Sequence, residues 1–221
     1  MRQQLLDILE IGPPSLDNFV PDNNEELLYT LKNLVAGNQQ DRFYYLWGST
    51  GCGKSHLLQA IATIFLEQQL NTFYIDCRQI DKLNIDSNID CLVIDNVEWL
   101  DPAAQIKLFN LYNQVRENTA SIFLASGSLP PAQLDIRQDL ATRLGWGLVY
   151  QVHELTDEKK IEVIQDYAAR CGFELPLEIC SYLLTHKQRD LSSLIKLVNA
   201  LDQLSLTRKR PVTLPLLREL L

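Results

Sequence analysis

Short, nearly continuous apolar runs alternate with helical patterns over the first two-thirds of the chain. Five such runs predict strands, at residues 43–47, 72–76, 91–95, 121–125 and 148–152. Strands that are apolar on both faces and separated by helices are typical of a parallel sheet covered on both sides. We therefore predict an α/β domain, in which Asp101 caps a helix that begins with Pro102.

The pattern changes near Leu155, beyond which no strand-like run occurs. Thr156 is a typical helix cap and is followed by two acidic residues, which favour a first helical turn. Further helical patterns cover residues 176–185, residues 191–206 and a short segment after Thr213. This part of the chain is therefore predicted to be a small, all-helical C-terminal domain.

Composition narrows the class of protein. A hydrophobic fraction of 46% and a charged fraction of 22% are ordinary for a globular protein, and no run approaches the roughly 20 apolar residues that span a bilayer. The net charge of −8 argues against a surface that follows a phosphate backbone. Five cysteines without C-x-x-C spacing favour reduced thiols, so with no signal-peptide pattern we expect a cytoplasmic protein without membrane contact.

Residues 48–55 fit the phosphate-loop pattern G-x-x-x-x-G-K-[ST], between an apolar run and a helical pattern. Glycines in such a loop let backbone N–H groups face phosphate oxygens at the start of a helix. We expect Lys54 to reach the β- and γ-phosphates and Ser55 to bind Mg²⁺. A chance glycine-rich turn is the alternative, and both flanks argue against it. The predicted nucleotide-binding residues of the loop are Gly48, Ser49, Thr50, Gly51, Cys52, Gly53, Lys54 and Ser55.

Asp95 ends the third apolar run and is the candidate Walker B carboxylate, which would hold Mg²⁺ directly or through water. The next residue is Asn96, where many ATPases of this class carry a second carboxylate. An amide can orient water but cannot accept its proton, so we expect weak intrinsic ATPase activity. Glu98 is close in sequence, with a solvated loop acid as its simplest interpretation. Whether ADP or ATP is the working ligand stays open.

Four segments in order along nearly the whole chain resemble the bacterial replication initiator DnaA, an AAA+ protein. They are residues 16–20, 51–58, 140–148 and 189–191. The resemblance implies an AAA+ P-loop sheet at 13–154, a helical lid domain at 155–221 and a flexible tail at 1–12. It also implies roles for Phe19 and Val20 near the adenine, for His56 beside the phosphate loop, for Arg143 as an arginine finger, and for Arg189 as a sensor 2 contact to the chain's own nucleotide.

DnaA carries a DNA-binding helix-turn-helix domain after its lid, whereas this sequence stops at Leu221. We therefore expect no direct sequence-specific DNA binding. A DnaA-like module of this kind is similar to the Hda family. The resemblance implies a protein that, bound to the DNA-loaded sliding clamp, stimulates hydrolysis of DnaA-bound ATP and prevents re-initiation.

The N-terminal segment resembles the hexapeptide that binds the sliding clamp, the β subunit of DNA polymerase III. Gln3 stands first, Leu6 fourth and Ile8 sixth in that pattern. A flexible tail could insert the two apolar side chains into a groove while the Gln3 amide hydrogen-bonds at its edge. The first turn of an amphipathic helix is the alternative.

Two further positions stay open at this stage. Arg143 could instead pair with Asp135 or Asp139, and Ser128, after the fourth run, is a sensor 1 candidate where the family more often has an acidic residue. Besides the Hda-like function, a DnaC-like helicase loader and another DnaA-related ATPase remain alternatives. A homo-oligomer is compatible with Arg143, because an arginine finger needs a neighbouring subunit.

Overall fold

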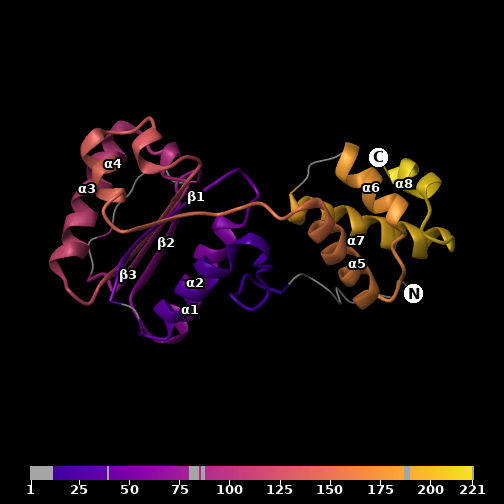
Figure 1. Ribbon diagram of the computed structural model, residues 1–221, viewed down its shortest axis with the longest axis horizontal. Helices are drawn as coiled ribbons and strands as arrows, with labels where there is room; N and C mark the ends of the chain where they lie inside the picture. The colour runs from indigo at the N-terminus through magenta and orange to yellow at the C-terminus, as the bar shows by residue number, and fades with distance from the viewer. Residues whose placement is uncertain (1–11, 39, 80–84, 86–87, 187–189, 221) are drawn as a thin grey trace, which may run out of the picture. The chain divides into compact units, whose positions relative to one another are not determined.

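The computed structural model describes residues 12–38, 40–79, 85, 88–186 and 190–220. The chain forms two compact units, Pro13–Glu154 and a C-terminal unit that includes Leu155–Leu221 (Figure 1). None of the helices in these described ranges has both the length and the apolar character needed to cross a membrane.

The first unit is built on a five-stranded sheet in the order β2-β3-β4-β1-β5. All neighbouring strands pair in parallel, as the continuous apolar runs predicted. The interior strand β3 is buried along its whole length, which is why it carries no polar residue before Asp95. The strands are β1 (Phe43–Trp47), β2 (Thr72–Asp76), β3 (Cys91–Asp95), β4 (Ile122–Gly127) and β5 (Leu148–Gln151).

Helices cover both faces of this sheet (Figure 1). Alternate side chains of β1 point into the two cores, Tyr44 and Leu46 into one and Tyr45 into the other. The first core is closed by α1 (Glu25–Val35) and α2 (Lys54–Glu67), and the second by α3 (Pro102–Glu117) and α4 (Gln138–Leu144). Short 3₁₀ turns occupy Asp22–Asn24, Val97–Trp99 and Pro131–Gln133.

The ends of the helices follow their capping residues. The Asp101 carboxylate accepts the backbone N–H of Ala104 at 2.6 Å, and Pro102 opens α3 as predicted. In the second unit, the Thr156 side chain accepts from the backbone of Lys159 and starts α5. Asp190 does the same for Ser193 at 2.9 Å and starts α7.

The second unit is entirely helical in the part that the structure describes. It consists of α5 (Asp157–Arg170), α6 (Leu177–His186), α7 (Leu191–Arg208) and α8 (Leu214–Leu220). Its own core contains fully buried residues from each helix, among them Ile164, Leu183, Leu194 and Leu217. The predicted fold class, a parallel α/β sheet followed by a small helical unit, is confirmed.

Candidate functional site

Sheet order and register bring four strand ends together at one edge. Asp76 of β2 lies opposite Asp95 of β3, and Ile94 lies opposite Ala125 of β4. The next residue of β4, Ser126, therefore lies beside Asp95. On its other side β4 pairs with β1, whose end leads into residues 48–55. The phosphate loop and Asp95 thus lie at the same carboxyl edge, which is where open α/β sheets bind their ligands.

Two glycines of the loop are placed where a side chain would not fit. A Cβ on Gly48 would lie 2.4 Å from the Val152 carbonyl oxygen. Gly53 has φ of 106°, a left-handed conformation that suits glycine, and a Cβ there would lie 2.8 Å from the Phe19 ring. The loop is therefore packed closely between the end of β5 and the segment that precedes α1.

Lys54 begins α2 and its ammonium group is held by the loop. Its Nζ donates to the carbonyl oxygens of Gly48 at 2.7 Å and Ser49 at 2.8 Å. The Cys52 thiol is 3.7 Å away, and burial raises the pKa of that thiol. A bound phosphate would compete with the two carbonyls for Lys54. Of the other predicted loop residues, Ser49, Thr50 and Gly51 are exposed and Ser55 is half-buried.

The segment before α1 packs on the start of α2. Phe19 lies over Gly53, and its ring centre is 5.8 Å from that of His56. His56 Nε2 contacts the Ser15 carbonyl oxygen at 2.9 Å, which ties the segment to the helix. Val20 follows and is half-buried. Phe19, Val20 and His56 therefore lie together next to the phosphate loop.

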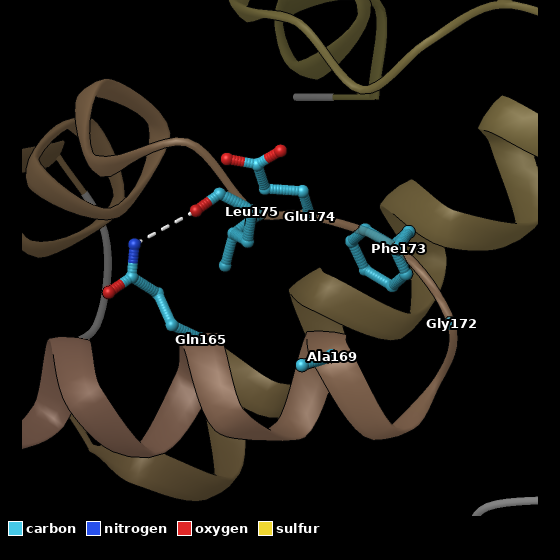
Figure 2. A pocket seen from close by; sticks show the side chains of 6 residues that line it. All are labelled: Gln165, Ala169, Gly172, Phe173, Glu174 and Leu175. Carbon is cyan, nitrogen blue, oxygen red and sulfur yellow. Dashed lines mark hydrogen bonds between the residues drawn. The ribbon is translucent and has the colours of Figure 1, made fainter.

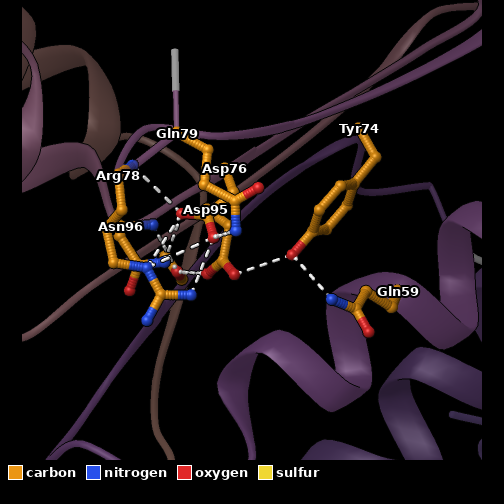
Figure 3. Close-up of polar contacts among 8 residues, drawn as sticks. Gln59, Tyr74, Asp76, Arg78, Gln79, Asp95 and Asn96 are labelled. Carbon is orange, nitrogen blue, oxygen red and sulfur yellow. Dashed lines mark hydrogen bonds and ion pairs between the residues drawn. The ribbon is translucent and has the colours of Figure 1, made fainter.

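Asp95 is fully buried, and hydroxyl groups satisfy both of its carboxylate oxygens (Figure 3). Tyr74 donates to Oδ2 at 2.7 Å, and Ser126 donates to Oδ1 in a very short hydrogen bond. Burial and the Asp95 carboxylate raise the pKa of Tyr74, so the phenol remains a donor. Gln59 of α2 in turn donates to the Tyr74 oxygen at 3.2 Å. The carboxylate is thus held in one orientation from two neighbouring strands.

Asn96 turns the chain sharply after β3. It adopts left-handed φ and ψ of 61° and 55°, a conformation that Asn tolerates better than most residues. Its N–H donates to Ser126 Oγ at 3.0 Å, and its side-chain amide donates to Asp76 Oδ1 at 3.0 Å (Figure 3). Arg78 binds the other side of Asp76 at 2.7 Å and lowers the pKa of that carboxyl. The Asn96 amide nitrogen is therefore committed to Asp76.

Glu98 and Ser128 follow the ends of β3 and β4, near the carboxyl edge of the sheet. Glu98 is only partly exposed, and its Oε2 is buried beside Gly127 without a hydrogen-bond partner among the described residues. It is therefore not a fully solvated loop acid. Ser128, the sensor 1 candidate, lies beyond β4 and is exposed, whereas Ser126 contacts Asp95.

Sequence reasoning missed Tyr74, Asp76 and Ser126 as parts of the site. Tyr74 and Asp76 of β2 and Ser126 of β4 contact Asp95 or Asn96, and only the strand register makes them neighbours. For Asp76 and Ser126 the available signal was their position at or just after the end of an apolar run, whereas Tyr74 lies in the middle of its run and gave no such signal. Ser55 and Asp95 offer oxygen atoms as metal ligands. Oxygen is the ligand type that Mg²⁺ prefers, so the chemistry of these residues fits that ion.

Arg143 lies in the last turn of α4, against two aromatic rings. Its guanidinium carbon is 4.0 Å from the ring centre of Trp146 and 5.7 Å from that of Phe109. Asp139 pairs with Arg137 at 2.7 Å instead. Across the described ranges, no ion pair joins Arg143 to either Asp135 or Asp139. The guanidinium is thus positioned by aromatic rings.

Four predicted residues lie outside the described residues. They are Gln3, Leu6 and Ile8 of the clamp-binding-like segment, and Arg189 of the sensor 2 segment.

Two families match the two units separately. The family described as bacterial DnaA ATPase domain matches residues 14–81 and 78–151, and the family described as Hda, lid domain matches residues 157–221. An uncharacterized protein of Haemophilus influenzae is 34% identical over an alignment of 235 positions, which covers 100% of this chain and 99% of the relative.

Solved structures of DnaA are similar in fold. AMPPCP-bound DnaA from Aquifex aeolicus aligns with a TM-score of 0.69 and 25% identity, over 87% of this chain and 66% of that one. Domain III of the Thermotoga maritima replication initiation protein DnaA aligns with a TM-score of 0.78 and 20% identity, over 95% of this chain and 96% of that one. The second likeness supports the fold alone.

Proposed function

Because the chain belongs to the family of bacterial DnaA ATPase domains and carries an Hda lid domain, we propose that it is a cytoplasmic AAA+ regulator of replication initiation. In this proposal it binds the DNA-loaded sliding clamp and stimulates hydrolysis of the ATP bound to DnaA. The stimulation comes from Arg143, and it prevents re-initiation by converting the initiator to its ADP form.

The chain's own nucleotide has a structural role in this proposal. ADP or ATP would lie in the loop at residues 48–55, with Mg²⁺ near Ser55 and Asp95 and with Arg189 on the phosphates. The structurally similar DnaA of Aquifex aeolicus is AMPPCP-bound, which supports a nucleotide at this loop. Asn96 offers no general base at the position after Asp95, so the expected intrinsic hydrolysis is weak.

The observation that carries the proposal is the Arg143 guanidinium. It is partly exposed, held against Trp146, and not neutralised by Asp139, which pairs with Arg137. A guanidinium is permanently charged and planar, and it matches the oxygens of a phosphate. An arginine supplied in trans to a reacting phosphate accelerates transfer by about 10³ to 10⁵. Arg143 has the chemistry and the accessibility that this role needs.

Clamp binding rests on the sequence Gln3-x-x-Leu6-x-Ile8. An extended peptide that inserts two apolar anchors into a groove gains affinity from burial, and the glutamine amide adds a directed hydrogen bond. Tethering to the clamp would raise the effective concentration of the chain near DnaA on DNA.

The test is conversion of ATP bound to DnaA, measured by chromatography of labelled nucleotide, with the chain and DNA-loaded clamp present. The wild-type chain should speed conversion, and Arg143→Ala should abolish the effect. Arg137→Ala is the matched control, because it removes an equal charge that Asp139 already neutralises. Gln3→Ala combined with Leu6→Ala should lower stimulation only when the clamp is present. No stimulation by the wild type, or full stimulation by Arg143→Ala, would refute the proposal.

A further inference from the structure

Two arginines share one exposed indole on the first unit. The guanidinium carbon of Arg143 lies 4.0 Å from the Trp146 ring centre, and that of Arg116 lies 4.9 Å from the same centre. Arg116 is in the last turn of α3 and Arg143 is in the last turn of α4. Trp146 is 55% exposed, which is unusual for a tryptophan that only fills a core. The three side chains therefore form one surface cluster, which we call the Arg–Trp cluster.

The positive charge of this cluster is not balanced locally. The distance between the two guanidinium carbons cannot exceed the sum of their distances to the ring centre. That sum is less than the Debye length, which is about 10 Å at 0.1 M salt. Their mutual repulsion is therefore not fully screened. Within the part of the chain that the structure describes, neither Arg116 nor Arg143 makes an ion pair. Cation–π contact with Trp146 attracts both guanidiniums but does not neutralise their charge.

A third cation strengthens the field beneath the cluster. The Arg42 guanidinium donates to the carbonyl oxygens of Asn118 and Ser121, so it is fixed in place. Burial raises the pKa of Tyr112, while Arg143, Arg116 and Arg42 all act to lower it. Three arginines thus act on one buried phenol in a chain whose net charge is −8. Positive charge concentrated at one place on an acidic protein favours a local anionic ligand.

We propose that Arg116 and Arg143 together bind the phosphate chain of a nucleotide held by a partner, with Trp146 as their shared platform. The inference rests on the proposed function, since it adds Arg116 to the site that Arg143 would present to DnaA. Arg143 meets the terminal phosphate, and Arg116 supplies a second guanidinium to the same chain of phosphates.

A polyphosphate fits the cluster better than a single carboxylate does. Two guanidiniums on one indole ring can each bind a pair of oxygens, and adjacent phosphates supply several charged oxygens in a row. Trp146 fixes both arginines before binding, which lowers the side-chain entropy that ordering them would otherwise cost. Duplex DNA is the competing ligand, and the test below treats it as a separate outcome.

The activity test compares Arg116→Gln with Arg143→Gln in the DnaA-bound ATP assay. Arg143→Gln should abolish stimulation, whereas Arg116→Gln, which loses one charge-assisted contact, should raise the half-maximal concentration of the chain by about ten- to a hundredfold. Arg137→Gln should leave it unchanged, because that arginine is already paired with Asp139. Arg116→Lys should restore activity only in part, since it keeps the charge without the planar group.

A binding test separates contact from a structural effect. Inorganic tripolyphosphate is added to the ADP-saturated chain, and the indole N–H signal of Trp146 is followed by NMR, assigned through Trp146→Phe. The signal should shift in the wild type and in Arg137→Gln, and stay unmoved in Arg116→Gln and Arg143→Gln. Urea unfolding of each variant confirms that the first unit is folded.

The outcomes distinguish this inference from the function on which it rests. If Arg116→Gln matches Arg137→Gln in both tests while Arg143→Gln is inactive, the second guanidinium is refuted and the proposed function stands. If Arg143→Gln remains fully active, the proposed function fails as well. If Arg116→Gln weakens binding of a duplex oligonucleotide, measured by fluorescence anisotropy, while its tripolyphosphate response equals that of the wild type, the ligand is DNA and the inference is wrong.

Discussion

Ser126→Ala removes a hydroxyl group that donates and accepts hydrogen bonds at the carboxyl edge of the sheet. Ser126 donates to the Asp95 carboxylate, and its oxygen accepts the backbone N–H of Asn96 at 3.0 Å. Ser126 and Asp95 are both fully buried, so water does not replace the lost partner easily. The change would leave Asp95 with only the Tyr74 hydroxyl, and the Asn96 N–H without an acceptor.

The magnitude follows from the cost of buried polar groups without partners. Each such group costs about 1–3 kcal/mol, and more when it is charged. Two groups are affected, one of them a carboxylate, and local relaxation recovers part of the loss. We therefore expect the free energy of unfolding to fall by about 2–4 kcal/mol. Ser128→Ala is the matched control, because Ser128 is exposed and should change stability by less than about 0.5 kcal/mol.

Urea unfolding followed by tryptophan fluorescence is a suitable assay. The chain has three tryptophans, and all of them (Trp47, Trp99 and Trp146) lie in the first unit, so the signal reports the unit that contains Ser126. The unfolding midpoint should drop in Ser126→Ala with the slope unchanged. A midpoint equal to wild type, or an equal drop in Ser128→Ala, would show that the contact between Ser126 and Asp95 does not hold the edge together.

Three further changes test other parts of the site. Gly53→Ala should weaken ADP binding, measured by calorimetry, at least tenfold. The new Cβ would meet the Phe19 ring at 2.8 Å, in a strained backbone conformation that costs about 1–3 kcal/mol. Gly37→Ala is the control, because Gly37 has φ of 72° with open space around it, and it should leave the affinity unchanged. Asn96→Asp should lower the free energy of unfolding by about 1–3 kcal/mol, since it replaces a donor to Asp76 with a second carboxylate; unchanged urea stability would contradict this. Arg78→Gln should cost up to about 1 kcal/mol at pH 7, because the pair is partly exposed. Arg78 holds the pKa of Asp76 below 3.8, so this stabilisation is present above pH 3.8 and is lost as the pH falls through the lowered pKa; a stability difference between wild type and variant that does not shrink as the pH falls below 3.8 would contradict the assignment.

The elements of the fold were predictable where burial leaves little choice of residue. The run at residues 91–95 has no polar residue before its last position, and it forms the fully buried β3. The Asp101-Pro102 pair fixed the start of α3 for local reasons, because the carboxylate caps the helix and proline suits its first turn. These signals lie within a few residues of the feature that they determine.

The contacts of the site depend instead on strand register, which the sequence pattern does not contain. Asp95 and Ser126 are 31 positions apart in sequence and meet only because β3 and β4 pair as they do. The same holds for Tyr74, which reaches Asp95 from β2. Whether Arg143 forms an ion pair or packs on an aromatic ring also depends on the three-dimensional structure, because Asp139 and Trp146 are both close to it in sequence.

The two polar regions of the first unit differ in how their charges are balanced. At the carboxyl edge, two hydroxyl donors satisfy Asp95, and Arg78 and Asn96 satisfy Asp76. Each of these carboxylates is therefore held in one orientation by donors of the chain itself. In the Arg–Trp cluster the reverse applies, because two cations lie on one ring without an ion pair among the described residues, and an external anion would lower their energy. This difference supports the proposed function, in which the chain holds its own nucleotide and Arg143 acts on phosphates bound to another protein.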